Sequence, residues 1–350
     1  RWSRHLRGEI FAWDAPNMSY DMNIIPNEPN FVSGKKIKLT EITKCRICSN
    51  EKLIPIINLG EQYLSGRFPA INEKEPIKSP LEMVKCDDFD NSEACGLVQL
   101  KHSVDIGEMY GETYGYRSGL NKSMVSHLGK IAIVIENLVE LNPGDVVLDI
   151  GSSDAVLLKA YQRRGLEKIG IDPAAEKFRS HYTDGIKLVS NFFNAERYFD
   201  IMKDKKAKAI TTISMFYDLD SPINFAKEIK SCLDNEGIWV LEQSYMPSML
   251  DANAFDTICH EHLEYYSLKQ IKWIMDAAGL KVFKVSFNDA NGGSFRIFAC
   301  HKDSRIISDD ASINKTLDEE RQRELYKTKP YIDFKNRVEK IKKQLVDFLL

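Results

Sequence analysis

The chain has 350 residues, of which 43% are hydrophobic, and a formal net charge of −3. This composition is typical of a soluble globular protein with two or three modules. Because 48 basic residues nearly balance 51 acidic ones, nothing indicates a nucleic-acid surface. No apolar run approaches the roughly twenty residues of a membrane span, and no signal-peptide pattern follows Arg1. We therefore expect a cytoplasmic protein with no nucleic-acid or membrane partner.

Residues 1–38 are polar and rich in turn-forming residues. Within them, the segment EIFAWDAPNMSYDMNIIPNEPNFVSGK resembles the tail of cupin-type epimerases that act on nucleotide sugars. On this interpretation they are the remnant of a fused upstream domain, and the chain is part of a larger fused polypeptide. In the alternative interpretation they form an N-terminal arm that packs on the next module.

The next segment, residues 39–106, contains four cysteines in two pairs. The C-x-x-C spacing of Cys45 and Cys48 lets both thiolates reach one ion, and Cys86 and Cys95 can supply a second pair. In a cytoplasmic chain this grouping favours a metal over disulfides. We predict a zinc-binding domain here, with free buried thiols as the alternative. Since four thiolates leave no open coordination position, the Zn²⁺ would be structural.

An α/β core module is predicted over residues 107–305. It begins with a helix whose apolar residues recur at helical spacing: Met124, Leu128, Ile131, Ile135 and Leu138. The loop before this helix is rich in hydrogen-bonding groups, namely those of Tyr114, Tyr116, Ser118 and Asn121. This loop is either a surface turn or a lid over a polyhydroxylated substrate.

The stretch DVVLDIGSSDAVLL, residues 145–158, has the pattern of a buried strand, a tight turn at Gly151 and a helix that opens at Ala155. Ser152, Ser153 and Asp154 are candidates to cap that helix. A second strand, KIGID, ends in Asp172, where an acidic side chain can bind ribose hydroxyls. The D-x-G-x-S pattern resembles motif I of class I S-adenosylmethionine-dependent methyltransferases. Plain α/β core packing is the alternative.

Alternating elements continue through the core. We predict strands near 146–151, 168–172, 186–190, 207–213 and 237–243, and a closing hairpin near 281–287 and 294–300. These elements make a Rossmann-like α/β fold with a mostly parallel seven-stranded sheet. Phe192 and Phe193 follow the third strand, where either an adenine ring or the core could cover their aromatic faces.

The segment FDTICHEHLEYYS, residues 255–267, is the candidate catalytic stretch, and we predict a helix start there. A neutral imidazole such as that of His262 is suited to general-base chemistry near pH 7, and the neighbouring Glu261 could orient it. A metal pair of His260 and His262 would need extended backbone, because helical residues two apart diverge. The remaining alternative is that these histidines are structural.

Residues 306–350 are predicted to be a helical module. Within it, residues 315–350 are predicted to form a helix with one apolar stripe: Phe334, Val338, Ile341, Leu345 and Phe348. We interpret them as the start of a truncated C-terminal domain.

Taken together, several motifs resemble the sugar C-methyltransferases of deoxysugar biosynthesis: CRIC, CGLVQL, YGYRSGLNKSM, LDIGSSDAVLL, MFYDLDSP, CHEHLEYYS and NGGSFRIF. The resemblance implies methylation of C3 of a nucleotide-linked 4-keto-6-deoxy sugar, with S-adenosylmethionine as methyl donor. It implies His262 as the base, assisted by Glu261. It further implies His260 and Tyr116 at the sugar and Gly151 and Asp172 at the cofactor. From the sequence we also predict that Tyr114, Asn121 and Asn291 bind the sugar and that Ser153 and Phe193 bind the cofactor.

Three residues depart from this family. Ala155 stands where glycine is frequent, Cys259 replaces a tyrosine before HEH, and Asn291 replaces a histidine before GGS. Two other functions therefore stay open. One is methyl transfer to a sugar oxygen or nitrogen, and the other is a non-catalytic, zinc-organised scaffold with a methyltransferase-like fold.

Overall fold

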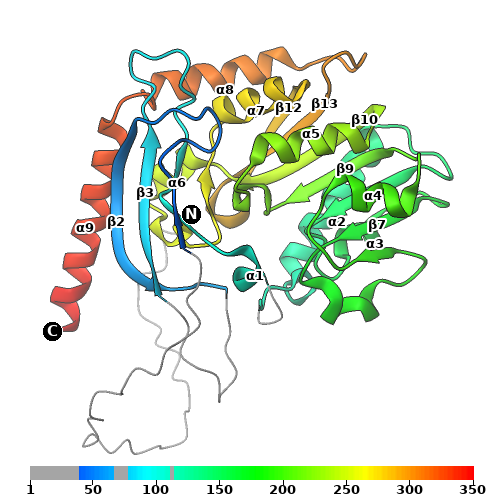
Figure 1. The fold of residues 1–350 in the computed structure, drawn as a ribbon, viewed down its shortest axis with the longest axis horizontal. Coiled ribbons are helices and arrows are strands. Elements are labelled where there is room, and N and C mark those ends of the chain that lie inside the picture. Colours follow the sequence, from blue (N-terminus) through cyan, green and yellow to red (C-terminus); the bar gives the residue numbers. More distant parts are fainter. Residues whose placement is uncertain (1–38, 67–77, 111–113) are drawn as a thin grey trace, which may run out of the picture. The chain divides into compact units, whose positions relative to one another are not determined.

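The computed structural model describes residues 39–66, 78–110 and 114–350, so the interpretations of residues 1–38 lie outside the described residues. A seven-stranded sheet has the order β12-β13-β10-β9-β6-β7-β8 (Figure 1). Its strands are β6 (Val146–Ile150), β7 (Glu167–Ile171), β8 (Lys187–Val189), β9 (Ala207–Ile213), β10 (Leu233–Ser244), β12 (Leu280–Asn288) and β13 (Ser294–His301). Strands β6 to β10 are parallel, and β13 pairs antiparallel with β10 and β12. The predicted mostly parallel sheet with a closing hairpin is confirmed.

Helices cover both faces of this sheet. Val146, Leu148 and Ile150 of β6 pack in one apolar cluster, and Val147 packs in the other. The first cluster includes residues of α4 (Ala195–Met202), α5 (Pro222–Cys232) and α7 (Leu268–Ala278). The second includes residues of α2 (Lys122–Leu138) and α3 (Val156–Ala160). Burial on both faces explains why the central strands are continuous apolar runs in the sequence.

A four-stranded antiparallel sheet has the order β11-β4-β3-β2. Its strands are β2 (Leu53–Tyr63), β3 (Lys78–Cys86), β4 (Val98–Leu100) and β11 (Glu264–Tyr265). A separate pair of strands joins β1 (Leu39–Glu41) to β5 (His102–Val104). Two short helices, α1 (Ile106–Met109) and α6 (Met246–Ala252), follow β5 and β10. The four-stranded sheet thus combines three strands of the N-terminal segment with one strand, β11, from the candidate catalytic stretch.

The helix start predicted within residues 255–267 is wrong. This segment forms a single 3₁₀ turn, η4 (Phe255–Thr257), then a tight turn and β11, and the helix α7 begins only at Leu268. Glu264 pairs with Gln99 and Tyr265 pairs with Val98. In addition, the Leu100 N–H donates to the Leu263 carbonyl at 2.8 Å. The segment is therefore extended because a strand far away in sequence satisfies its backbone.

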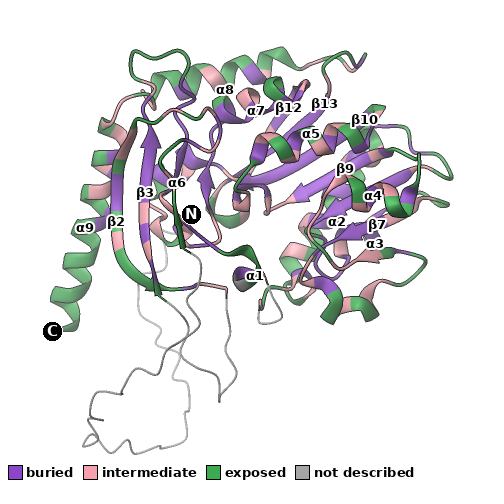
Figure 2. Cartoon of the chain, in the orientation of Figure 1, coloured by how far each residue is buried: buried purple, intermediate pink, exposed green. Residues whose placement is uncertain are grey.

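The C-terminal residues form two helices instead of the single predicted one, α8 (Asp310–Gln322) and α9 (Lys329–Leu349). Pro330 lies in the first turn of α9, where its missing N–H costs no hydrogen bond. Phe334 and Val338 of the predicted stripe pack in a cluster with Ile57 and Met83 of the four-stranded sheet. Beyond them the stripe is exposed, and Phe348 is 85% exposed (Figure 2). None of the helices that the structure describes is both long and apolar enough to span a membrane.

Candidate active site

A cavity of about 700 Å³ opens at the carboxyl ends of β6, β7, β9 and β10. Gly151, Asp172, Ser214 and Ser244 line it, and each lies at the end of its strand or just after it. The chain passes from β6 to one side through β7 and β8, and then crosses to β9 on the other side. Open α/β sheets bind their ligands at such a reversal of strand order.

The turn after β6 has three residues with positive φ, namely Gly151 at 75°, Ser153 at 48° and Ala155 at 62°. A Cβ atom on Gly151 would lie 3.1 Å from Cγ of Met215, so glycine suits the turn in space as well as in conformation. Gly151 and Ser153 both line the cavity. The backbone of the motif I turn therefore forms one wall of the cavity.

The predicted helix capping by residues 152–154 is wrong. Helix α3 begins at Val156, and no side chain caps it. Ser152 instead contacts the Tyr182 hydroxyl at 2.7 Å, and Asp154 accepts from Arg117 Nε at 2.8 Å and from the Gly119 N–H at 3.2 Å. Ser153 and Asp154 therefore bind the loop before α2, where Ser153 Oγ accepts from the Ser118 N–H at 3.3 Å, and they do not cap α3.

Ala155 does not narrow the cavity. Its side chain is buried in the apolar cluster beneath α2 and α3, and it is not among the lining residues. Its φ of 62° is unfavourable for a residue with a Cβ atom, by about 1–2 kcal/mol. The positive φ of this residue therefore explains why glycine is frequent at this position in the family that the sequence resembles.

Asp172 lies at the carboxyl end of β7 and lines the cavity. One of its oxygens accepts from the Ser153 N–H at 2.8 Å, and the other accepts from the Ala174 N–H at 2.7 Å. Burial raises the pKa of this carboxyl, and the two backbone donors oppose the shift. Asp172 is thus held rigidly beside the motif I turn.

Sequence reasoning missed Asp149, although it lies within the D-x-G-x-S pattern. Asp149 lines the cavity, and Thr211 Oγ1 donates to its Oδ1 at 2.6 Å. Burial raises its pKa to about 7. Its signal in the sequence was an acidic residue near the end of an otherwise apolar strand.

Phe193 and Phe192 line the cavity on the side of β8, as does Phe178. The Phe193 ring packs edge-on against Phe225, with centroids 5.3 Å apart. One aromatic wall of the cavity is therefore fixed by core packing.

His262 lines the cavity from the segment before β11. Its Nδ1 lies 2.9 Å from the Thr257 carbonyl oxygen, and its ring centroid lies 4.1 Å from that of Tyr217. A carbonyl can only accept, so Nδ1 carries the proton and Nε2 of the neutral ring carries the lone pair. Burial lowers the pKa of His262 and so favours this neutral form. The geometry is that of an imidazole held ready to accept a proton.

The other two members of the His-Glu-His triplet do not line the cavity. His260 is buried, and its Nε2 lies 3.1 Å from the Ser79 carbonyl oxygen on β3. Glu261 accepts a short hydrogen bond from the Ser65 hydroxyl. The triplet therefore turns its side chains toward different parts of the chain, and the two imidazoles bind separate carbonyls.

Among the other predicted substrate residues, Tyr114, Tyr116 and Asn291 line the cavity, and the Tyr116 side chain is half exposed. Asn121 does not line it, because it caps α2 by accepting from the Ser123 N–H at 2.9 Å. Tyr110 and Asp218 also line the cavity, and sequence reasoning did not single them out. Asp218 lies within the motif MFYDLDSP, so its signal was an acidic residue in the loop that follows β9.

The four predicted cysteine ligands lie together. The Sγ atoms of Cys45, Cys48, Cys86 and Cys95 all lie within 4.8 Å of one another, and two of the pairs are 3.5 Å apart. Sulfurs at about 2.3 Å from a tetrahedral Zn²⁺ would be about 3.8 Å apart. Asn50 Nδ2 and the Cys95 N–H point at the Sγ atoms of Cys86 and Cys48, each at 3.4 Å, as donors that would stabilise thiolates. The donor set and its spacing fit a zinc ion.

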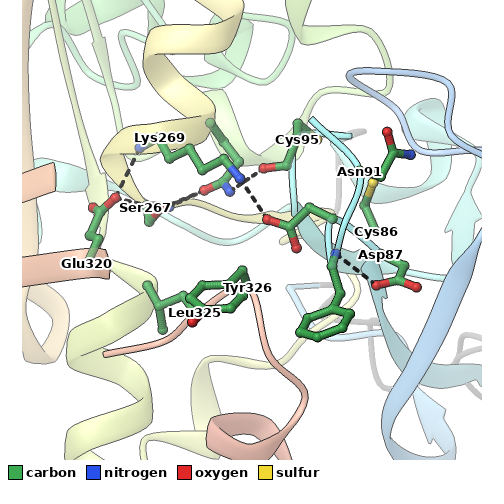
Figure 3. Close-up of polar contacts among 12 residues, drawn as sticks. Cys86, Asp87, Asn91, Cys95, Ser267, Lys269, Glu320, Leu325 and Tyr326 are labelled. Atoms are coloured by element: carbon green, nitrogen blue, oxygen red, sulfur yellow. Dashed lines mark hydrogen bonds and ion pairs between the residues drawn. The ribbon is translucent and has the colours of Figure 1, made fainter. Parts of the chain in front are cut away.

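Polar contacts join the cysteine cluster to the start of α7, as Figure 3 shows. Gln270 Nε2 donates to the Cys95 carbonyl at 2.8 Å, and Lys269 Nζ lies 2.6 Å from Asp88. From α8, Glu320 accepts from the Leu268 N–H at 2.7 Å and from the Lys269 N–H at 3.1 Å. The helix that follows the candidate catalytic segment is thus anchored to both the cysteine cluster and the C-terminal helices.

The glycine turn after β6, the acidic residue at the end of β7 and the cavity above them define a class I S-adenosylmethionine-dependent methyltransferase fold. Three family models match the sequence: a domain described as zinc binding over residues 45–110, a methyltransferase domain over 127–285, and a C-methyltransferase C-terminal domain over 289–350. The three matches follow one another along the chain, which therefore resembles methyltransferases built from these domains.

The chain is also similar to individual known proteins. It is similar to the C-methyltransferase NovU of Streptomyces niveus, with 25% identity over 309 residues that cover 87% of this chain and 71% of that protein. Among solved structures, the CcbJ methyltransferase from Streptomyces caelestis has 12% identity and a TM-score of 0.39, over 50% of this chain and 89% of that chain. The mitomycin 7-O-methyltransferase MmcR has 15% identity and a TM-score of 0.39, over 51% and 54% of the respective chains. The predicted resemblance to C-methyltransferases is confirmed by the family models and by NovU.

Proposed function

We propose that the protein methylates C3 of a nucleotide-linked 4-keto-6-deoxy sugar, with His262 as the base that removes the C3 proton. The observation that carries this proposal is the placement of His262, whose Nδ1 is held by the Thr257 carbonyl while the ring lies at the cavity wall. The similarity to a C-methyltransferase supports transfer to carbon.

The proposed methyl transfer needs few catalytic groups. A 4-keto group acidifies the hydrogen on C3, and Nε2 of neutral His262 can accept that proton. Bound S-adenosylmethionine supplies the electrophilic methyl group. Gly151, Ser153 and Asp172 would hold this cofactor, with Phe193 beside its adenine. The protein must also exclude water and keep the reacting carbon about 3 Å from the methyl group.

Glu261 would act on the base only indirectly, because it does not line the cavity. Its hydrogen bond with Ser65 instead ties the turn at residues 260–261 to the turn that follows β2. We therefore propose a positioning role for Glu261, and a role in holding the same turn for His260.

The cysteine cluster would hold one structural Zn²⁺. With four thiolates as ligands the ion has no open position for substrate. It would stabilise the N-terminal sheet, to which β11 and hence the His262 segment belong.

Transfer to a sugar oxygen or nitrogen is the alternative, and it requires the same fold and a base. The test is to incubate the protein without cofactor in deuterium oxide with a panel of dTDP- and GDP-linked 4-keto sugars. Loss of the C3 proton into solvent supports the C-methylation route, because only this route forms an enolate. Methylation without such exchange would support the alternative, and failure to bind S-adenosylmethionine in calorimetry would support a non-catalytic scaffold.

Replacing Asp172 by alanine is expected to weaken S-adenosylmethionine binding by about 1.5–3 kcal/mol, the range for a hydrogen bond to a charged group. The reason is its place at the end of β7 within the cavity wall. Calorimetry measures the effect. Asp184→Ala, an exposed carboxylate before β8 that does not line the cavity, is the matched control. An unchanged dissociation constant for Asp172→Ala would show that the ribose lies elsewhere.

A further inference from the structure

Asp218 is a cavity residue to which the proposed base chemistry gives no role. It is the last residue of a 3₁₀ turn, η3 (Phe216–Asp218), that follows β9. It lines the cavity, and its Oδ1 is buried without a hydrogen-bond partner among the described residues. Its neighbour in the chain, Tyr217, is the residue whose ring packs on His262. Asp218 therefore lies in the wall of the cavity beside the residue that packs on the proposed base, and it has one buried, unpartnered oxygen.

The surroundings of Asp218 offer it no positive charge. In the described part of the chain it forms no ion pair, and Arg46 is engaged two residues further on, at Asp220 and near Glu264. The titratable groups that interact electrostatically with Asp218 are all acids: Tyr110, Tyr114, Tyr217, Cys259, Glu261, Glu264 and Tyr265.

These surroundings favour the neutral acid. Burial raises the pKa of Asp218 well above its ordinary value, the hydrogen bond from Tyr110 opposes this, and the charge of Glu261 raises the pKa further. A neutral carboxyl has one O–H donor, whereas a carboxylate can only accept. Because Oδ1 of Asp218 has no hydrogen-bond partner among the described residues, the proton of the neutral acid is available for another acceptor.

We propose that the neutral carboxyl of Asp218 donates a hydrogen bond to the substrate oxygen that becomes an enolate oxygen when His262 removes the neighbouring proton. This inference rests on the proposed function. It makes Asp218 a catalytic residue, and it makes Tyr110 a positioning residue that acts through Asp218.

The proton balance is simple. The C–H bond electrons at C3 move into the C3–C4 bond, the carbonyl electrons move onto the oxygen, and the proton goes to Nε2 of His262. Transfer of the methyl group from bound S-adenosylmethionine to C3 would break the sulfur–methyl bond, leave a neutral thioether and restore the carbonyl. The proton on His262 later leaves to solvent. Asp218 shares its proton with the oxygen and keeps it. A donor placed where negative charge develops typically contributes about 10²–10³-fold to the rate.

The test compares Asp218→Ala with Asp218→Asn, because an amide N–H can replace the donor but cannot act as a base. Asp218→Ala should lower kcat for methyl transfer, and the rate of C3 deuterium exchange, by about 10²–10³-fold. Asp218→Asn should stay within about tenfold of the wild type, and the affinity for S-adenosylmethionine should not change in either variant. Asp200→Asn, at an exposed residue of α4, is the matched control.

Two outcomes would overturn the proposal. If Asp218→Asn is as inactive as Asp218→Ala, the ionised carboxylate is required, and Asp218 acts as a second base. If Asp218→Ala keeps the wild-type kcat and exchange rate, the residue does not touch the reacting atoms.

A measurement on the free enzyme separates this inference from the proposed function. The infrared difference spectrum of wild type minus Asp218→Asn at pH 7 should contain the carbonyl band of a protonated carboxyl. Absence of that band would refute a neutral Asp218. If the band is present but the wild type neither exchanges nor methylates any 4-keto sugar, the proposed function fails while the neutral acid in the cavity stands.

Discussion

Replacing His262 by alanine or asparagine is expected to abolish methyl transfer together with the cofactor-independent exchange of the substrate's C3 hydrogen. Positioned general bases contribute about 10²–10⁴-fold, so losses in that range are expected in both reactions. The affinity for S-adenosylmethionine should hardly change. His262 belongs to the segment before β11, whereas the proposed cofactor residues follow β6 and β7. His181→Asn, at a histidine that does not line the cavity, is the matched control.

The pH dependence gives a second readout of the same base. His262 must be neutral to accept a proton, and burial lowers its pKa below the ordinary value of about 6.5. The exchange rate in the wild type should therefore be flat with respect to this group around pH 7, and should fall only below its ordinary pKa. Normal exchange by His262→Ala would place the base elsewhere, with Tyr116 as the next candidate in the cavity. Loss of cofactor binding together with exchange would mean that His262 maintains the fold.

The core of the fold could be predicted because its signals are local. Val146 to Ile150 is an apolar run because residues on either face of β6 meet a helix layer, and the same holds for the neighbouring parallel strands. The turn at Gly151 and the acidic Asp172 follow directly from strand ends. The cysteine pairs could be predicted because the ligand chemistry of Zn²⁺ restricts their spacing.

The candidate catalytic segment could be predicted only in part, because its conformation depends on contacts distant in sequence. Residues 264 and 265 become a strand only because Gln99 and Val98 pair with them. The side chain of Glu261 turns to Ser65 for the same kind of reason, so its adjacency to His262 in the sequence did not translate into a shared site. Asp218 was missed because an acidic residue after a strand is a common surface feature, and only the structure shows its buried oxygen at the cavity.

The packing of the C-terminal helix could likewise be predicted only in part from the sequence. The apolar stripe of residues 334–348 has helical spacing throughout, but only its first half contacts the four-stranded sheet. Tyr331, Phe334 and Val338 pack in one apolar cluster with residues of β2, β3 and β4, a contact that no local pattern indicates. Periodicity predicted the helix, whereas its packing partner depended on the tertiary fold.

Replacing Cys86 by serine, or removing metal with a chelator, is expected to release zinc and unfold the N-terminal sheet. Zinc adds about 10–16 kcal/mol to the folding of zinc-finger peptides, which is comparable to the whole net stability of a typical protein. Cys86 ends β3, and its N–H donates to the Leu97 carbonyl at 2.8 Å beside β4. Since β4 pairs with β11, the loss should extend to the His262 segment and abolish activity although no metal touches the substrate.

Three measurements test these effects: metal analysis for zinc content, thermal unfolding for stability, and hydrogen exchange for protection of residues 255–267. Cys300→Ser is the matched control, because Cys300 is an equally buried cysteine on β13 outside the cluster. It should keep one zinc per chain and normal protection of the His262 segment. A Cys86→Ser protein that retains full zinc and stability would refute the metal site. Loss of zinc with unchanged protection of residues 255–267 would instead show that β11 is held by α7 and Glu320 alone, through the contacts of Glu320 with the Leu268 and Lys269 N–H groups.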